Sequence, residues 1–471
     1  MRLLVSGEDA YGALTALADN AERTLDLQYY LIRGDGSGRA LMAHVRSAAE
    51  RGVRVRLLID DLNTSGEDAR MLLFTRHPNI EVRLYNPFPS GRFSTISRVI
   101  TSLTDVSRIN HRMHNKMFVA DNALAITGGR NVGDAYFVHS ASSNFVDLDA
   151  IVAGNAVLAL SKSFDKFWNN PLAYPVGEIV GPLAVDSALA ADAPSELPEP
   201  LSDSIDTNQL AVELKAGKLD LAWAPATVLA DQPSKILAEG EPEKHETVAD
   251  EIAALMRSTR SELIVISPYF VPGQKGMALF AGLAEHGVKL RVLTNSLVTT
   301  DAPVVHIGYA KYRKAMLELG TELYELRPRL GATKSRLGSF GSSQASLHAK
   351  ALVFDRQTVL IGSMNMDPRS ANLNSEIGLV IRSRRIAAQL VQLFEDVGRA
   401  GSYRVELTPD NKLRWSAEAP DDGRPLGAAL ATGADAPAQT GTIVTDDEPE
   451  ATAWLKFSLK LLAPFAPEEM L

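Results

Sequence analysis

The 471-residue sequence contains no cysteine. A disulfide framework, a thiolate metal site and a cysteine nucleophile are therefore all excluded. The sequence also lacks an excess of positive charge, because 48 Lys and Arg face 57 Asp and Glu and the formal net charge is -9. Phosphate-backbone affinity needs clustered positive charge, so no nucleic-acid partner is expected, although a local basic cleft is compatible with this composition.

Long hydrophobic runs are absent as well. No stretch reaches the roughly 18 to 20 uncharged apolar residues that a membrane-spanning helix needs. Charged and polar residues interrupt 1–27, which therefore does not read as a secretory signal. These features predict a soluble or peripheral protein on the cytoplasmic side. The composition, 45% hydrophobic and 22% charged, is typical of a folded protein, and the length suits two domains with connecting segments.

An internal repeat is the clearest organising feature of the chain. In each half a β-rich apolar run, an amphipathic stretch and a second β-rich run follow one another, which predicts a strand, a helix and a strand. The three segments span 24–32, 38–52 and 53–61 in the first half and 262–271, 276–287 and 288–296 in the second. Because the spacing between the copies is nearly constant, the halves are predicted to be duplicated domains.

Strands that alternate with helices predict the α/β class, with two duplicated α/β/α sandwich domains whose sheets lie between helical layers. Two stretches rich in Pro, Ala and acidic residues, 188–208 and 416–451, have no apolar period and read as connecting segments. The predicted division is a first domain over 1–185, a linker or excursion over 186–245, a second domain over 246–415, and a flexible tail over 416–471 with a C-terminal amphipathic segment.

Each half contains one His-x-Lys-x4-Asp motif followed by a Gly- and Asn-containing segment. The first motif comprises His114, Lys116 and Asp121 and is followed by Gly129 and Asn131; the second comprises His348, Lys350 and Asp355 and is followed by Ser363 and Asn365. In a strand, residues two apart point to the same face, so each His and Lys are predicted to project into one site. The Asn follows its His by 17 positions in both halves.

These residue types suit the chemistry of a phosphodiester. Two Lys and two Asn can stabilise a negatively charged phosphoryl group without a metal or another cofactor. One neutral imidazole can attack phosphorus while a second, protonated imidazole gives a proton to the leaving alkoxide. Water then releases the phosphohistidine in a hydrolase, and another alcohol releases it in a transferase. A metal site is disfavoured because the lysines would repel a cation.

Further residues are candidates for supporting roles. A histidine usually needs a carboxylate to set its tautomer, and Asp147 and Glu376, which follow the two motifs, are predicted to provide it. Asp121 and Asp355 belong to the catalytic motifs, but at the strand ends they are expected to form turns or ion pairs. A single His-x-Lys pair often lies merely on the solvated face of a strand. Two complete copies of the motif, one in each duplicated domain, favour a functional site.

The segments HNKMFVAD with GGRN and HAKALVFD with GSMN resemble the phospholipase D superfamily, and the wider chain resembles its bacterial cardiolipin synthases of the C type. The resemblance implies two such domains packed with pseudo-twofold symmetry around one site. It also implies phosphatidyl transfer between phospholipids, from phosphatidylglycerol with phosphatidylethanolamine or a second phosphatidylglycerol, to give cardiolipin. His114 would be the nucleophile and His348 the general acid, although the symmetry of the motifs leaves the reverse order open.

Two alternatives belong to the same superfamily: a phospholipase D that hydrolyses phospholipids to phosphatidic acid, and a nuclease, which the acidic composition disfavours. The resemblance places the protein peripherally on the cytoplasmic face of the bacterial inner membrane. Residues 454–467 are predicted to lie in the membrane interface as an amphipathic segment or, alternatively, to dock on the protein. Residues 86–110, apolar and basic, are predicted to form a lipid entrance or to cover the sheet.

Overall fold

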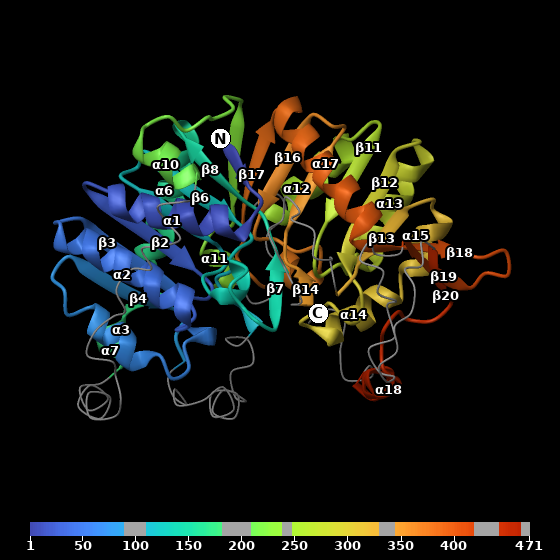
Figure 1. Cartoon of the computed structure of the whole chain (residues 1–471), viewed down its shortest axis with the longest axis horizontal. Helices are drawn as coiled ribbons and strands as arrows, with labels where there is room; N and C mark the ends of the chain where they lie inside the picture. Colours follow the sequence, from blue (N-terminus) through green and yellow to red (C-terminus); the bar gives the residue numbers. More distant parts are fainter. Residues whose placement is uncertain (89–109, 181–208, 238–246, 329–343, 419–441, 463–471) are drawn as a thin grey trace, which may run out of the picture.

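The computed structural model of the chain describes residues 1–88, 110–180, 209–237, 247–328, 344–418 and 442–462 (Figure 1). The predicted segment 86–110 lies almost wholly outside the described residues. Within the described part, the chain forms two large sheets, one in each half, which stand side by side with helices packed against their faces (Figure 1).

The first sheet has eight strands in the order β1-β8-β6-β5-β2-β3-β4-β9. Its strands are β1 (Arg2–Leu4), β2 (Thr24–Tyr29), β3 (Arg54–Asp60), β4 (Ile80–Tyr85), β5 (Met117–Ala120), β6 (Leu124–Gly128), β8 (Asp149–Ala153) and β9 (Ala173–Pro175). The helices of this half are α1 (Gly7–Asn20), α2 (Gly36–Glu50), α3 (Asp68–Phe74), α6 (Asn155–Trp168) and α7 (Val176–Ile179), with short 3-10 turns η1 (Asp61–Asn63) and η2 (Asp134–Tyr136).

The second sheet has ten strands in the order β10-β17-β16-β15-β11-β12-β13-β18-β19-β20. Its strands are β10 (Ala226–Ala230), β11 (Glu262–Ile266), β12 (Lys289–Asn295), β13 (Glu322–Leu326), β15 (Ala351–Phe354), β16 (Thr358–Gly362), β17 (Ile377–Arg382), β18 (Ser402–Leu407), β19 (Leu413–Glu418) and β20 (Thr442–Thr445). The remaining helices are α10 (Gln209–Lys215), α11 (Ser234–Leu237), α12 (Val248–Ser258), α13 (Gly273–Glu285), α14 (Pro303–Ala310), α15 (Arg313–Glu318), α16 (Pro368–Asn372), α17 (Arg384–Ala400) and α18 (Ala453–Leu462).

The two sheets share one topology, which confirms the predicted duplication. Strands β2, β3 and β4 are parallel, as are β11, β12 and β13. In each half the motif hairpin, β5–β6 or β15–β16, joins this parallel core in antiparallel fashion. The predicted helices begin two or three residues early, at Gly36 and Gly273. Gly52 and Gly287, with φ of 100° and 75°, then permit the tight turns into β3 and β12.

The hydrophobic core explains why the halves pack together. Helices α1 and α2 cover one face of the first sheet, and α12 and α13 cover one face of the second. The other faces, covered by α6 and α17, belong to a single continuous cluster that contains side chains of both sheets. Because burial of apolar surface is the main favourable term in folding, this shared layer joins the two sandwiches into one body and positions the motifs against each other.

The structure places ordered elements in the segment predicted as a linker or excursion and in the segment predicted as a flexible tail. Within 186–245, α10 packs on α1, and β10 pairs with β17 at the edge of the second sheet. Within 416–471, β20 pairs with β19, and α18 contacts α14. Short apolar strands such as β10 gain their stability from pairing with a sheet that is distant in sequence, so local composition alone does not reveal them.

Candidate functional site between the two halves

The motif aspartates lie at the turn of each hairpin, at the far end of the strand from the histidine and lysine. Asp121 and Asp355 have φ of 54° and 51°, in the left-handed region that a tight hairpin requires. The Asp121 carboxylate accepts hydrogen bonds from the backbone N–H groups that open β2, and Asp355 does the same for β11. The structure therefore does not bring these carboxylates to the histidines; they tie each hairpin to its neighbouring strand.

The histidine and lysine of each motif do not lie within the hairpin strand, which corrects the predicted strand geometry. Strands β5 and β15 begin directly after Lys116 and Lys350. The preceding residues leave the sheet because their backbone pairs with the opposite half: His114 N donates to Ser375 O at 2.9 Å, and His348 N donates to Val146 O at 2.8 Å. Lys116 Nζ donates to His114 O at 2.6 Å, and Lys350 Nζ lies 3.1 Å from His348 Nδ1, so in each half the lysine still lies beside its histidine.

The segment before His348 pairs with the first half in a two-stranded parallel sheet of β7 (Ser143–Val146) and β14 (Gln344–Leu347). Its counterpart on the other side is a single bridge between Met113 and Ser375. The two crossings are equivalent in register, since each joins the residue before a motif histidine to the residue before a predicted carboxylate partner.

Each histidine contacts the carboxylate of the other half. His114 Nδ1 lies 3.0 Å from Glu376 Oε2, and His348 Nδ1 lies 2.6 Å from Asp147 Oδ2. All four side chains are buried. A carboxylate at Nδ1 fixes the ring orientation and directs Nε2 toward the reacting centre. The structure thus brings together the predicted partners, and it assigns them crosswise between the domains.

The first half has Gly129 beside the shorter acid, Asp147, whereas the second half has Ser363 beside the longer acid, Glu376. Ser363 Oγ donates to Glu376 Oε2, which holds the longer side chain. A Cβ atom added at Gly129 would lie 2.2 Å from Asp147 Oδ1, so a serine side chain at this position would displace the Asp147 carboxylate. The shorter Asp147 carboxylate instead accepts the Leu148 N–H at 2.8 Å.

The two histidine–carboxylate pairs differ electrostatically. Burial opposes the charge on Asp147, but the adjacent His348 and Lys350 outweigh it and lower the pKa of Asp147 to about 2. Burial raises the pKa of Glu376 to about 7. Burial, reinforced by Lys116, lowers the pKa of His114 well below its usual value. The pKa of His348 is also lowered by burial, but Asp147 opposes that shift. Of the two carboxylates, Asp147 is therefore the more fully ionised, and it is the one that contacts His348.

Both motif lysines are buried cations with no carboxylate in ion-pair contact among the described residues. Burial lowers the pKa of Lys116 to about 7, and it lowers the pKa of Lys350 as well. Within the same described part, the Oδ1 atoms of Asn131 and Asn365 are buried without a hydrogen-bond partner. Because uncompensated buried charge is costly, an anion bound beside the lysines would stabilise this arrangement.

Aromatic side chains that sequence reasoning did not identify pack against the histidines. Tyr30 lies edge-on to His114, with ring centroids 5.0 Å apart. Tyr136 and Phe145 contact His348, with centroids at 5.3 and 5.0 Å. Tyr30 directly follows the parallel strand β2, and the carboxyl ends of such strands commonly carry functional side chains, which is the signal that could have indicated it.

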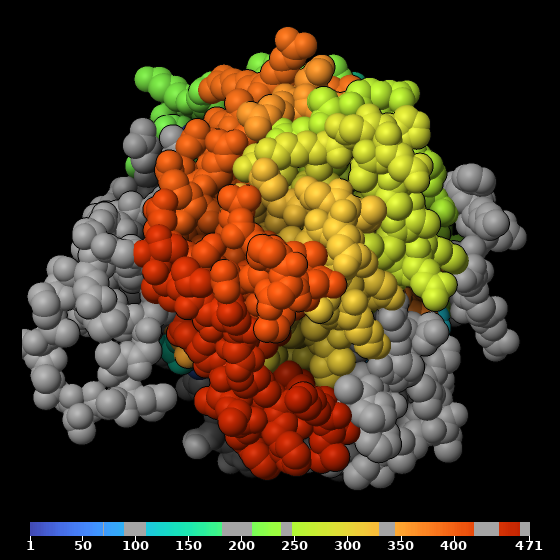
Figure 2. Space-filling view, turned by 90° about the vertical axis from the view of Figure 1, so that its right-hand side faces the viewer, coloured from blue at the N-terminus to red at the C-terminus, as the bar shows by residue number. Residues whose placement is uncertain are grey.

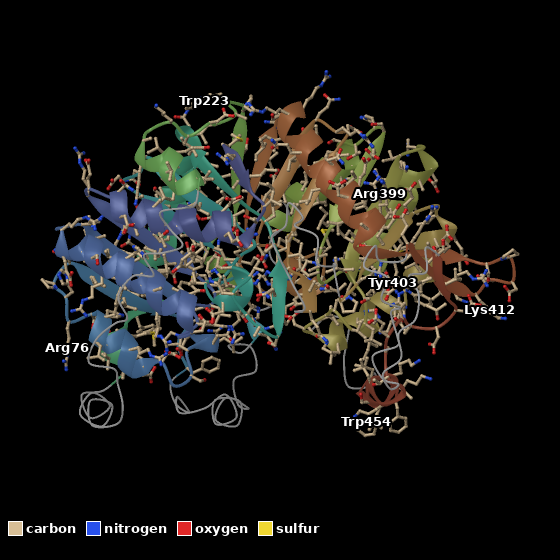
Figure 3. All side chains as sticks on the ribbon, in the orientation of Figure 1. Arg76, Trp223, Arg399, Tyr403, Lys412 and Trp454 are labelled. Atoms are coloured by element: carbon tan, nitrogen blue, oxygen red, sulfur yellow. The ribbon has the colours of Figure 1, made fainter. Side chains whose placement is uncertain are left out.

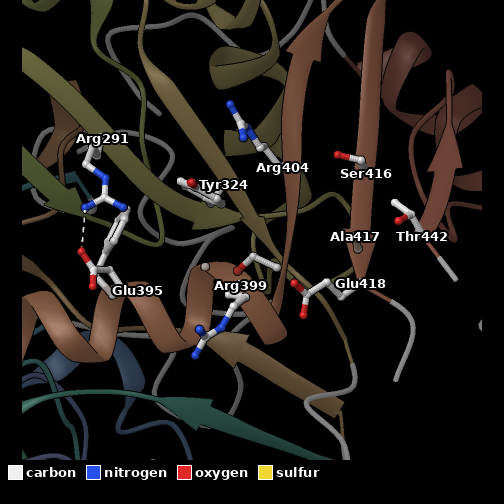
Figure 4. Close-up of a pocket in the computed structure, with 12 residues that line it drawn as sticks. Arg291, Tyr324, Glu395, Arg399, Arg404, Ser416, Ala417, Glu418 and Thr442 are labelled. Atoms are coloured by element: carbon white, nitrogen blue, oxygen red, sulfur yellow. Dashed lines mark hydrogen bonds and ion pairs between the residues drawn. The ribbon is translucent and has the colours of Figure 1, made fainter. Parts of the chain in front are cut away.

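A cavity in the second half lies away from these residues. It has a volume of about 400 Å³ and is formed by α17, the strands around it and the paired strands β19 and β20, and none of the residues that line it belongs to the motifs (Figure 4). Arg291, on its wall, is ion-paired to Glu322 and Glu395. The cavity is therefore separate from the histidine site. Among the helices that the structure describes, none is sufficiently long and apolar to cross a membrane.

Comparisons with known proteins give a consistent result. The family model described as "Cardiolipin synthase, PLD-like domain" matches residues 14–168 and 252–397. The sequence is 39% identical to cardiolipin synthase C of Escherichia coli (strain K12), over 86% of each chain. It is 26% identical to a cardiolipin synthase of Geobacillus kaustophilus (strain HTA426), over 88% of this chain and 69% of the relative. Among solved structures, phosphatidylserine synthase of Haemophilus influenzae Rd KW20 shares the fold, with a TM-score of 0.64, 13% identity and coverage of 100% of this chain and 95% of that one.

Proposed function

Because this chain belongs to the phospholipase D-like family of cardiolipin synthases, we propose that it transfers a phosphatidyl group between two phospholipids through a phosphohistidine on His114. One observation carries the proposal: two buried histidines, each held by the carboxylate of the opposite half, adjoin two buried lysines that have no carboxylate in ion-pair contact within the described structure. Such a site suits a reaction in which negative charge enters as a phosphoryl group.

In the first step, the Nε2 lone pair of neutral His114 forms a bond to phosphorus as the bond from phosphorus to the headgroup oxygen breaks. The proton on His348 Nε2 passes to the departing alkoxide. Burial lowers the pKa of both histidines; Asp147 opposes this shift at His348, whereas Lys116 and Lys350 reinforce it at His114, which supports His114 as the neutral nucleophile. Lys116 and Lys350 stabilise the charge on the phosphoryl oxygens.

In the second step, His348, now neutral, accepts the proton of an incoming hydroxyl as its oxygen attacks phosphorus. The bond between His114 and phosphorus breaks, and both histidines return to their starting states. A glycerol hydroxyl of phosphatidylglycerol as the acceptor gives cardiolipin, with phosphatidylethanolamine or a second phosphatidylglycerol as the phosphatidyl donor. Water as the acceptor gives phosphatidic acid. We place the enzyme peripherally on the cytoplasmic face of the bacterial inner membrane, as the resemblance implies.

A product assay tests this function. The purified chain is incubated with vesicles of phosphatidylglycerol and phosphatidylethanolamine, and the lipid products are resolved by mass. Cardiolipin is expected from the wild type, and the His114→Ala variant should form none. Phosphatidic acid without cardiolipin would identify a hydrolase and would contradict the transferase proposal. Vesicles of each lipid alone identify the donor and the acceptor.

A further inference from the structure

Helix α18 packs on the second half through one of its sides. Leu459 is buried, and the helix contacts α14. Lys456 forms an ion pair with Asp447, and the Thr452 hydroxyl accepts the Leu455 N–H at 3.1 Å, which caps the start of the helix. The helix is therefore fixed in place through its inner side.

The outer side of α18 is apolar and faces solvent. Trp454, Phe457 and Leu461 recur at the spacing of one helical face, and they are 74%, 58% and 64% exposed. The Trp454 and Phe457 rings lie 6.0 Å apart and form one continuous patch. Lys460 is exposed on the adjacent side of the helix. Large apolar side chains that cluster on a surface mark a site that contacts a membrane or another molecule.

This combination of residues fits a phospholipid bilayer. Short helices with Trp, Phe and Leu on one face and Lys beside them insert that face at the boundary between headgroups and acyl chains. The whole chain carries a formal net charge of -9, so its overall field does not draw it to an anionic membrane. Attachment must then depend on a local apolar contact, with lysines such as Lys460 facing the anionic headgroups.

The position of α18 agrees with this role. The helix lies at the lower edge of the molecule, below α14, and the crossed strands β7 and β14 beside His348 also lie in the lower half (Figure 1). In the view from the right-hand side, the C-terminal residues form the lower edge of the second half (Figure 2). Trp454 projects from this edge, whereas Trp223, which is 79% exposed, projects from the opposite one (Figure 3).

We propose that Trp454, Phe457 and Leu461 form a membrane-docking face that inserts into the phospholipid bilayer. The inference rests on the proposed function, because a lipid substrate is presented in a bilayer. It adds the surface through which the protein contacts that bilayer, and it orients the lower edge of the molecule toward the membrane.

Vesicle co-sedimentation tests the docking face. The triple variant W454S/F457S/L461S should bind vesicles of phosphatidylglycerol and phosphatidylethanolamine at least about tenfold more weakly than the wild type, because the buried apolar area is lost. Trp223→Ser is the matched control and should bind normally. Both variants should retain the wild-type turnover of a short-chain phospholipid dispersed in detergent, which shows that the fold and the site are intact.

Three results would overturn the docking face: unchanged vesicle binding by the triple variant, an equal loss in Trp223→Ser, or a change in self-association with no change in vesicle binding. Failure of the proposed function is distinguishable from these results. If the wild type binds vesicles through this face but forms neither cardiolipin nor phosphatidic acid, the function is wrong and the docking face stands.

Discussion

At the scale of a single residue, the buried ammonium group of Lys116 lowers the stability of the fold and serves the site. Its ammonium group is buried without a carboxylate in ion-pair contact in the described structure, near a second lysine. Its pKa is about 7 in the folded protein against a usual value of 10.5. Between these two pH values the unfolded chain binds the proton and the folded chain does not. The contribution of Lys116 to the free energy of unfolding therefore rises as pH increases from about 7 to 10.5.

We predict that Lys116→Met raises the free energy of unfolding at neutral pH by about 0.5 to 2 kcal/mol and abolishes phosphatidyl transfer. The thioether side chain keeps the volume and removes the uncompensated charge. Thermal denaturation and the product assay measure the two effects. Lys412→Met, at an ion pair that is 70% exposed on the lysine side, is the control and should change neither quantity. A less stable Lys116→Met protein would contradict this reading of the buried charge.

At the scale of the elements, the close approach of the β6 end to the start of β8 holds Asp147 against His348. A methyl group at position 129 would enter that contact, since it would lie 2.2 Å from Asp147 Oδ1. We predict that Gly129→Ala lowers kcat about tenfold to a hundredfold, because the carboxylate that orients His348 is displaced.

The control for this substitution is Gly378→Ala in β17, where an added Cβ would meet only ordinary contacts, the nearest at 3.6 Å from Leu360. It should retain activity close to that of the wild type. Steady-state kinetics with detergent-dispersed substrate separates the two variants. Equal activity in both would show that the Asp147 position does not govern turnover.

Elements with a strong local pattern could be predicted, and elements that depend on distant partners could not. The alternation of β-rich and amphipathic segments predicted β2, α2 and β3 and their copies, because this pattern reflects burial of each element. The segments around His114 and His348 were predicted as strand, but their backbone pairs with the opposite half. Asp147 and Glu376 were predicted from their positions as partners, whereas the crosswise pairing needed the packing of both domains.

At the scale of the whole molecule, each half supplies the carboxylate that contacts the motif histidine of the other half. The charge of one half therefore affects the titration of a histidine in the other. Asp147 belongs to the first half, yet its carboxylate opposes the lowering of the pKa of His348 that burial causes in the second half. Since the pKa of Asp147 is about 2 rather than the usual 3.8, this carboxylate contributes stability above pH 3.8 that is lost as pH falls toward 2.

We predict that Asp147→Asn, which removes the charge, lowers the pKa of His348. The basic limb of the pH–rate profile, which requires protonated His348, should then move to lower pH. Histidine NMR titration and the profile measure the shift, and Glu376→Gln is the matched variant at the other pair. An unchanged His348 titration in Asp147→Asn would exclude the crosswise coupling.

The most direct test of the account is to trap the covalent intermediate on a phosphatidyl ester of p-nitrophenol, a leaving group that departs without protonation. Rapid quenching and peptide mass spectrometry locate the adduct. We predict a phosphatidyl group on His114 in the wild type, the same adduct in His348→Ala, and none in His114→Ala. An adduct on His348, or turnover of this ester without any phosphohistidine, would contradict it.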